Sequence, residues 1–353
     1  MTAPNPRIAI PILFAVVFID LIGFGILVPL VPFYVQRLGV GPELITLVIA
    51  LQPLSQSLVT PLWGALSDRV GRRPVLLASM FGHACAYALL AFADTLGLLI
   101  LSRVLSGVTS ANIGTAYAYI ADITPPSERA GGLGKISAAF GLGFAVGPGI
   151  GGLLAGGDSM AEANFVLPAI TAAGFSLLAF VAILVFLKES LPPDKRSVRR
   201  RAGEPGTLRN LARVAKRPII TVMLMLCVLV ITAMSVRESI YSLWLNARLE
   251  LNARQIGLVV AYAGGMVFLI QMFGIGRLAK RFGELNLVKT ALVCLATSWL
   301  LLVASDGIPG IIVAMTFGAF GTAFFQTNMQ AMMSLRAGPT ERGAVLGAVS
   351  YTH

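Results

Sequence analysis

The chain has 353 residues, of which 56% are apolar and only 12% are charged. A soluble domain carries roughly 25% charged residues, because a hydrated surface must cover its core. This composition excludes an ordinary soluble protein and favours a membrane protein. The formal net charge of +11 would also fit a nucleic-acid-binding protein, so the positions of the basic residues have to be considered.

Ten apolar runs are long enough to span a bilayer, which takes about 20 residues. The first run is too long for a signal peptide and has no small-residue cleavage site, so we expect it to be retained. The connection over residues 188–218 is long, basic and contains Pro and Gly, which indicates a cytosolic linker. In chain order, the predicted helices cover residues 8–35, 44–66, 74–93, 96–121, 132–156, 165–187, 219–245, 255–276, 287–304 and 309–334.

The basic residues are distributed unevenly between the two sides of the predicted membrane protein. When alternate loops are assigned to opposite sides, 22 of the 27 Lys and Arg residues fall on one side. The positive-inside rule makes that side, which includes the N-terminus, cytosolic. Membrane topology therefore accounts for the basic charge, and no nucleic-acid partner is expected. We predict a monomeric, multi-pass protein of the plasma (inner) membrane.

Two sequence patterns recur at nearly one offset. The octapeptide GALSDRVG at 64–71 returns 212 residues later as GRLAKRFG at 276–283, and residues 127–137 resemble residues 340–350 at an offset of 213. We therefore predict an all-α fold of two pseudo-symmetric six-helix bundles. Residues 1–187 form the first bundle, residues 188–218 the linker and residues 219–353 the second bundle.

A second half as long as the first would end near residue 400. We therefore expect about ten complete helices, with the second bundle C-terminally truncated to four helices and the start of a fifth. Polar faces left without helix partners are costly in hydrocarbon. We expect the 353-residue form to be unstable and inactive, and residues 1–187 to remain a coherent bundle.

Several motifs together point to one family. One is a loop pattern at Gly64, Asp68, Arg69, Gly71, Arg72 and Arg73, and a second, in the fifth helix, comprises Gly143, Gly147, Pro148, Gly151 and Gly152. The others are Arg103-x-x-x-Gly107 and the pattern that runs from Asp20 to Pro32. With these motifs the chain resembles the major facilitator superfamily, specifically its twelve-helix drug:proton antiporter branch. Residues 119–124 are similar to tetracycline efflux proteins.

The resemblance implies that the loop at 64–73 is a conformational latch. In the family, the residue equivalent to Asp68 locks the cytosolic side against the start of the eleventh helix, and a carboxylate at a helix N-terminus gains roughly 0.3–1 kcal/mol. Lys280 replaces this acid in the second copy, so the lock is expected to be one-sided. The alternative is that Arg72 and Arg73 simply lie at the cytosolic surface beside lipid phosphates.

The helix-5 motif places Gly143, Gly147 and Gly151 on one stripe, and Gly152 on a neighbouring one. Small residues four apart allow helix backbones to approach closely. The resemblance to antiporters adds that such an interface resists proton leak and lets the two halves rock. Simple helix packing is the alternative interpretation.

Asp20 lies about 18 Å along the first helix, near the middle of the bilayer. An ionisable group at this depth costs at least ~2.5 kcal/mol, so we expect it to face a wet cavity or the bundle interior. It is a candidate carrier of the coupled proton, and a structural hydrogen bond is the alternative.

Three other polar residues are candidates near the proton pathway. Arg103 is expected to be a cavity cation that senses the protonation of an acid, or else a snorkelling outer-leaflet residue. Glu238, next to Arg237, is a second proton-site candidate or a solvated residue at the mouth. His83 is an interior histidine with satisfied hydrogen bonds, or a proton relay.

Side-chain amides occur on several predicted helices. Within a bilayer they seek partners, so they line a substrate cavity or hold helices together. The cavity-lining candidates are Gln52, Gln56, Asn112, Gln271, Gln326, Asn328 and Gln330.

Three positions depart from the tetracycline exporters. Those proteins carry acids where this chain has Ala86 and Trp299, and a histidine where it has Val267. These differences argue against tetracycline as the cargo. Gln271, in contrast, matches a glutamine of those exporters.

We therefore predict proton-coupled efflux of a small amphipathic compound by alternating access. Export of a sugar or other metabolite, or a non-functional truncated fragment, are the alternatives. The sequence has no G-x-x-x-x-G-K-[ST] phosphate loop, and its histidines, His83 and His353, form no metal motif. Cys85, Cys227 and Cys294 lie in apolar runs and are expected to be buried hydrophobic side chains. We expect no enzymatic activity, metal or cofactor.

Overall fold

The computed structural model describes residues 6–125, 129–157, 162–192 and 218–336, and the regular structure in these ranges is entirely helical. Within them, ten spans are long and apolar enough to cross a membrane. The predicted all-helical, multi-pass fold is therefore confirmed. Most of the linker and the expected start of the eleventh helix lie outside the described residues.

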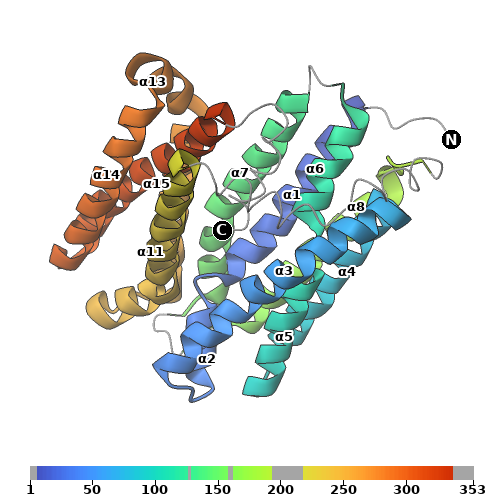
Figure 1. Ribbon diagram of the computed structural model, residues 1–353. Coiled ribbons are helices and arrows are strands. Elements are labelled where there is room, and N and C mark those ends of the chain that lie inside the picture. Colours follow the sequence, from blue (N-terminus) through green and yellow to red (C-terminus); the bar gives the residue numbers. More distant parts are fainter. Residues whose placement is uncertain (1–5, 126–128, 158–161, 193–217, 337–353) are drawn as a thin grey trace. The chain divides into compact units, whose positions relative to one another are not determined.

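Among the N-terminal helices, two pairs of consecutive helices each make a single membrane span, namely Pro6–Arg37 and Leu96–Ile123 (Figure 1). The helices are α1 (Pro6–Leu27), α2 (Val31–Arg37), α3 (Pro42–Val70), α4 (Arg72–Ala91), α5 (Leu96–Thr109), α6 (Asn112–Ile123), α7 (Arg129–Ala155) and α8 (Val166–Phe186). The fourth predicted helix, expected to be continuous over 96–121, is instead interrupted at residues 110 and 111 between α5 and α6. The apolar run that identifies a span does not reveal such an interruption, because hydropathy is averaged over a window.

The remaining described helices follow the linker. They are α11 (Pro218–Leu249), α12 (Ala253–Leu269), the π-helical turn η2 (Ile270–Gly274), α13 (Ile275–Phe282), α14 (Glu284–Ala304) and α15 (Ile308–Arg336). Together α12, η2 and α13 make one span, Ala253–Phe282. The π-turn inserts an extra residue into the helical ladder of this span.

The chain divides into two compact units. The first comprises residues 1–203 and 242–261, and the second comprises residues 204–241 and 262–353. In the first unit α1 packs against α6, α7 and α8, and α4 packs against α5 and α8. Leu13, Val16, Leu76, Met80 and Tyr119 belong to its buried core.

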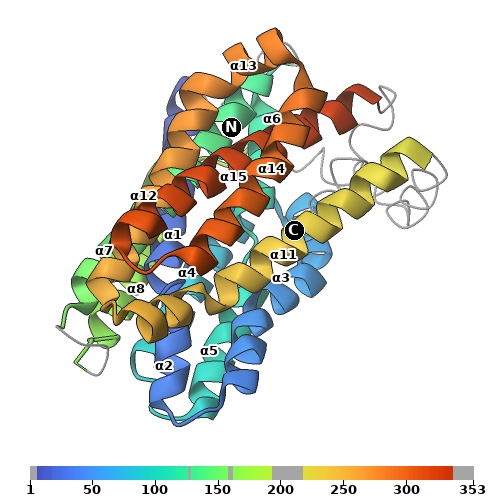
Figure 2. The ribbon, with the colours of Figure 1, turned by 90° about the vertical axis from the view of Figure 1, so that its left-hand side faces the viewer.

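In the second unit α14 and α15 lie side by side (Figure 2). Ala291 and Leu295 of α14 are buried in the same cluster as Ala323 and Phe325 of α15. The small alanines let the two helix backbones come close, and the Leu and Phe side chains fill the space between them.

Equivalent glycines open equivalent helices in the two copies of the repeat. Gly71 has φ 110° and precedes α4, and Gly283 has φ 77° and precedes α14. A side chain with a Cβ is strained at such positive φ values. The two glycines are 212 residues apart, which is the offset found in the sequence.

The prediction that all three cysteines are buried is wrong for Cys85, which is exposed on α4, while Cys227 is buried and Cys294 is half-buried. An apolar run contains both core-facing and lipid-facing positions. The run alone therefore does not tell which of the two a cysteine occupies.

Candidate functional site

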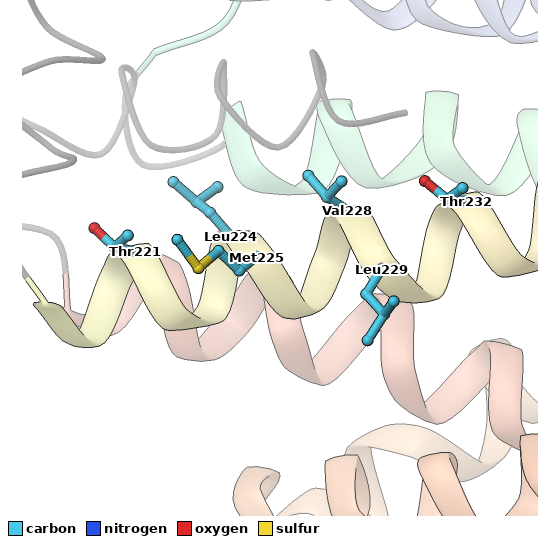
Figure 3. A pocket seen from close by; sticks show the side chains of 6 residues that line it. All are labelled: Thr221, Leu224, Met225, Val228, Leu229 and Thr232. Carbon is cyan, nitrogen blue, oxygen red and sulfur yellow. The ribbon is translucent and has the colours of Figure 1, made fainter.

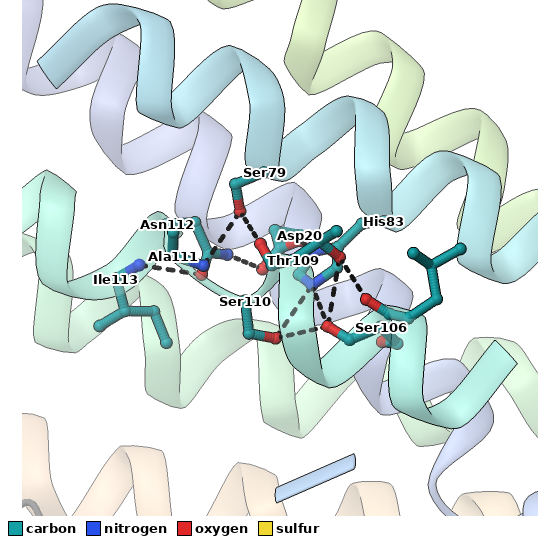
Figure 4. A network of polar contacts seen from close by, with 10 residues as sticks. Asp20, Ser79, His83, Ser106, Thr109, Ser110, Ala111, Asn112 and Ile113 are labelled. Atoms are coloured by element: carbon teal, nitrogen blue, oxygen red, sulfur yellow. Dashed lines mark hydrogen bonds and ion pairs between the residues drawn. The ribbon is translucent and has the colours of Figure 1, made fainter. Parts of the chain in front are cut away.

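Asp20 is buried midway along the first span, with 4% of its surface exposed. Its Oδ1 lies 2.8 Å from Nδ1 of His83 on α4, and its Oδ2 accepts a hydrogen bond from the side-chain amide of Asn112 on α6 (Figure 4). Both carboxylate oxygens are thus held by groups from other helices. The carboxyl group has polar partners inside the bundle, which offsets the cost of burying it.

His83 has partners on both ring nitrogens. Its Nε2 lies 3.1 Å from the backbone carbonyl oxygen of Ser106 and 3.0 Å from Oγ of Ser110. The Tyr87 ring stacks on the imidazole with 5.7 Å between the centroids. The sequence analysis did not single out Ser106 or Ser110, although these two serines are four residues apart on the same predicted helix and near the depth of Asp20.

The interruption between α5 and α6 brings the histidine's partners into place. At this point the Ser110 N–H donates to the Gly107 carbonyl, 3.1 Å away. Ser79 of α4 spans the interruption, because its Oγ donates to the Thr109 carbonyl at 2.6 Å and accepts from the Ala111 N–H at 3.2 Å. The interruption is thus held by α4, the helix that carries His83.

Helix α4 also approaches the interruption very closely. A Cβ added at Gly82 would lie 2.2 Å from Cγ2 of Thr109, so only glycine fits there without movement. The residue before His83 therefore allows the close contact on which the polar network depends.

Arg103 lies on α5 and is buried. Its Nη1 donates to Oε1 of Gln52 on α3 at 2.8 Å, and its Nε and Nη2 atoms have no hydrogen-bond partner among the described residues. The guanidinium is therefore bound to an amide rather than to Asp20. That it senses the protonation of an acid stays a prediction.

Glu238 belongs to α11, in the second unit. Its side chain is 52% exposed, and its Oε1 lies 4.0 Å from Nη2 of the adjacent Arg237. Neighbouring helical residues point in different directions, so this ion pair is at the limit of the contact distance. The role of Glu238 in proton transfer stays a prediction.

The amide candidates occupy different surroundings. Asn112 and Gln52 bind Asp20 and Arg103 in the first unit. The Asn328 amide is buried and donates to the Phe324 carbonyl of its own helix at 2.7 Å. The other candidates are half-buried or exposed, namely Gln56, Gln271, Gln326 and Gln330.

The segment 64–73, expected to be a loop, is helical except at Gly71, because α3 continues to Val70 and α4 begins at Arg72. Gly64 and Arg69 are exposed and Arg72 is buried, with 3% of its surface exposed. The Arg72 guanidinium donates to Asp68 at 2.7 Å and to Asp122 of α6 at 3.0 Å. The expectation that Arg72 lies at the cytosolic surface is therefore wrong. Two carboxylates and the hydroxyl of Ser67, 2.8 Å away, replace the water that the charge would otherwise need.

The start of α4 carries a second carboxylate contact that the sequence analysis missed. Glu189 accepts hydrogen bonds from the backbone N–H groups of Arg72 and Arg73, at 2.8 and 3.1 Å. These are unpaired donors of the helix N-terminus, which also favours negative charge. The Arg73 side chain donates to the Leu184 carbonyl at 2.7 Å, so it is tied to α8.

The glycines of α7 contact two helices. A Cβ at Gly143 would lie 2.7 Å from Cβ of Leu21, and one at Gly151 would lie 2.2 Å from the Ile26 carbonyl, both on α1. On the neighbouring stripe, a Cβ at Gly152 would lie 2.6 Å from the carbonyl oxygen of Ala253, which belongs to the same unit. Pro148 lies within α7, which continues past it to Ala155. These close approaches explain why the stripes are glycine; their role against proton leak stays a prediction.

An open apolar depression runs along α11 in the second unit (Figure 3). It is lined by Thr221, Leu224, Met225, Val228, Leu229 and Thr232. A single helix supplies all of these side chains, and they are almost entirely apolar. Such a surface suits contact with lipid better than recognition of a polar ligand.

Comparisons with known proteins place the chain in a family. Residues 13–353 match the sequence profile of the Major Facilitator Superfamily. The class C tetracycline resistance protein of Escherichia coli is 31% identical over 97% of this chain and 85% of its own length, and the quinolone resistance protein NorA of Staphylococcus aureus (strain MRSA252) is 27% identical over 88% and 76%.

Solved structures share the fold. The D323A mutant of the nucleoside transporter NupG has a TM-score of 0.80 at 14% identity, over 98% of this chain and 87% of that chain. A D-xylose–proton symporter has a TM-score of 0.71 at 14% identity, over 97% and 86%. The profile match over nearly all of the sequence, together with the helical spans and the internal repeat, shows that the chain belongs to the major facilitator superfamily.

Proposed function

We propose that this chain is a proton-coupled transporter that exports a small amphipathic compound by alternating access. The observation that carries the proposal is Asp20, a buried carboxyl group midway through the first span, in contact with the titratable His83. An ionisable residue inside the membrane is expensive to insert and is therefore a functional candidate. We assign it the coupled proton.

The known relatives support efflux as the direction of transport and drug-like compounds as cargo. Those compared above are named for resistance to tetracycline and to quinolones, and a further one, from Bacillus subtilis (strain 168), is named multidrug resistance protein 2. At Ala86, Val267 and Trp299 this chain lacks polar side chains of the tetracycline exporters. We therefore propose a cargo other than tetracycline.

The second candidate function is transport of a sugar or other metabolite. The solved structures that share the fold include a nucleoside transporter and a sugar symporter, but at 14% identity these show the fold alone. The mostly apolar spans favour an amphipathic cargo. We further propose a monomer in the plasma (inner) membrane with a cytosolic N-terminus, since the basic residues gather on that side.

Uptake into inverted membrane vesicles tests the proposal directly. Vesicles energised by a proton gradient are given a panel of fluorescent cationic dyes, quinolones, tetracycline, nucleosides and sugars. We expect gradient-dependent uptake of amphipathic dyes or quinolones, abolished by a protonophore. Uptake of sugars or nucleosides alone would favour the second candidate, and uptake that ignores the gradient would contradict proton coupling.

The variant Asp20→Asn tests the residue assignment. It should remove gradient-driven uptake while the protein still inserts into the membrane, because an asparagine amide cannot release a proton in the pH range of the assay. Asp94→Asn is the matched control, since Asp94 is an exposed carboxylate in the turn between α4 and α5. Active uptake by Asp20→Asn against a gradient would contradict the assignment.

A further inference from the structure

We propose that His83 shares the coupling proton with Asp20, and that Ser110 is a positioning residue that stabilises the site after the proton has left. The proposal rests on the proposed function for the use to which the proton is put. The protonation change itself is a property of the site that can be measured without transport.

The contacts of His83 reveal how many protons the site holds. A carbonyl oxygen can only accept a hydrogen bond, so the 3.1 Å contact between Nε2 and the Ser106 carbonyl is a hydrogen bond in the state in which Nε2 carries a proton. A second proton lies between Nδ1 and the Asp20 Oδ1, 2.8 Å apart, whichever of the two atoms holds it. The pair therefore has no net charge, which is its proton-loaded state.

Asn112 limits where this second proton can reside. Its side-chain amide donates to Oδ2 of Asp20, so that oxygen acts as an acceptor. The acidic proton is thereby confined to Oδ1, the oxygen that faces the imidazole. The Asp20 carboxyl group and the His83 imidazole then titrate as one unit rather than as two independent groups.

When one proton leaves for water, the charge of the pair changes from zero to minus one. The proton between Nδ1 and Oδ1 stays, because without it two acceptors would face each other. The Nε2 atom is then unprotonated, and its lone pair faces the Ser106 carbonyl. This arrangement is unfavourable unless another donor reaches Nε2.

Ser110 is that donor. Its Oγ lies 3.0 Å from Nε2 and 2.9 Å from the Ser106 carbonyl, to which it donates in the loaded state. Rotation of the hydroxyl redirects its proton to the bare Nε2. The Ser106 carbonyl then loses two donors, the imidazole and the Ser110 hydroxyl, and keeps the longer contact from the Thr109 hydroxyl at 3.3 Å.

Because the fourth span is interrupted, the hydrogen bonding of the Ser106 carbonyl depends on whether His83 holds its proton. In an unbroken helix the Ser110 N–H would bond to the Ser106 carbonyl, but here it donates to Gly107 instead. Loss of the proton therefore weakens the hydrogen bonds that hold the junction of α5 and α6. Proton occupancy and the geometry of this span are thus linked through Ser106 and Ser110.

The surrounding helices add few other charges. Tyr87 stacks on the imidazole from α4, and Arg103 of α5 is bound to Gln52. Helix α8 has no titratable side chain. The remaining charged residues in the sequences of α1, α3, α6 and α7 are Arg7, Glu43, Asp68, Arg69, Asp122, Arg129 and Lys135, all away from the middle of their spans.

The chain offers a direct spectroscopic test, because it contains only two histidines, His83 and His353. The variant His353→Ala, labelled with ¹⁵N-histidine and placed in lipid nanodiscs, reports His83 alone. We expect Nε2 to be protonated at low pH and unprotonated at high pH, with the Nδ1 proton retained at high pH. A bare Nδ1 with a protonated Nε2 at high pH would overturn the proposal.

Ser110→Ala, in the same background, tests the positioning role. The unprotonated form loses its only proposed donor to Nε2, whereas the protonated form keeps the Ser106 carbonyl. The proton affinity of His83 should therefore rise by about two- to tenfold, and the titration midpoint should move to higher pH. Ser110→Thr keeps the hydroxyl and should restore the original midpoint.

Ser102→Ala is the matched control. Ser102 is also buried, lies eight residues earlier in the chain, on α5, and donates to the Leu99 carbonyl of that helix. It should leave the midpoint unchanged. A midpoint in Ser110→Ala that does not move, or that moves to lower pH, would overturn the role of Ser110.

Transport measured on the same variants separates this inference from the proposed function. The pH profile of uptake should shift with the midpoint in Ser110→Ala. If the spectroscopic shift is present and uptake ignores the proton gradient, the proton site stands and the proposed function fails. If uptake is gradient-driven while Nε2 never changes protonation, the inference fails and the proposed function stands.

Discussion

Gly25 of α1 and Gly147 of α7 face each other so closely that a Cβ at Gly147 would lie 2.8 Å from the Gly25 Cα atom. The contact is between backbones, so no flexible side chain can move aside to make room. It lies one to two turns from Asp20 along α1 and fixes the distance between the two helices.

Gly147→Ala should therefore destabilise the first unit by about 1–3 kcal/mol through overpacking. Gly174→Ala is the control, since a Cβ at Gly174 of α8 would meet no atom within 4 Å. Its effect should be neutral or slightly stabilising, because alanine favours the helix. Thermal unfolding in detergent, followed by circular dichroism, compares the two variants, and equal melting temperatures would contradict this packing argument.

Asp122→Asn should cost more stability than Asp68→Asn. Arg72 and Asp122 are both buried, with side-chain exposures of 3% and 8%, whereas Asp68 is 38% exposed. Removing one partner of a buried ion pair costs about 3 kcal/mol or more, and an exposed pair is worth roughly 0–1 kcal/mol. Denaturant unfolding of both variants measures how much stability each one loses. A larger loss of stability for Asp68→Asn than for Asp122→Asn would contradict the prediction.

Asp68→Asn should instead slow transport. The latch function implied for the motif at 64–73 predicts a two- to fivefold lower kcat, corresponding to a contact of roughly 0.3–1 kcal/mol. The KM should hardly change, because Asp68 lies near the C-terminal end of α3, whereas Asp20 lies midway along its own span. Initial rates of uptake over a range of cargo concentrations measure both constants. A raised KM with normal kcat would argue against a latch.

Arg103 and Gln52 should be energetically coupled. The guanidinium Nη1 donates to the amide oxygen at 2.8 Å, and a buried hydrogen bond to a charged group contributes roughly 1.5–3 kcal/mol. A double-mutant cycle with Arg103→Met and Gln52→Leu should return a coupling energy of about that size.

Gln56, one turn away from Gln52 on α3, supplies the control pair for this cycle. Arg103→Met and Gln56→Leu should be additive within about 0.5 kcal/mol. If both cycles give the same coupling energy, the hydrogen bond between Arg103 and Gln52 contributes no coupling of its own and the prediction is wrong.

The amino-acid sequence predicts the spans and the repeat well, because both depend on patterns local to the chain. The apolar runs correspond to the ten spans. Gly71 and Gly283, which the repeat makes equivalent, each directly precede a helix, α4 and α14. The depth of Asp20 likewise follows from counting residues along one helix. Which residues meet Asp20 depends on how neighbouring helices are rotated, and packing determines that.

His83 and Arg72 illustrate what this kind of reading misses. His83 contacts Asp20, 63 residues away, and Arg72, besides its neighbour Asp68, contacts Asp122, 50 residues away. One local signal was available, since Ser106 and Ser110 are four residues apart on the helix predicted over 96–121. The same spacing singled out Gln52 and Gln56 as cavity candidates, but the serines are short and common in membrane helices.

Helix α4 turns His83 toward the polar network and Cys85, two residues later, toward the outside of the bundle. The centre that we assign to the proton is thus insulated from hydrocarbon by the thickness of a single helix, about 10 Å. The fatty-acid chains beside α4 consequently form part of the dielectric in which the Asp20–His83 pair takes up and releases its charge.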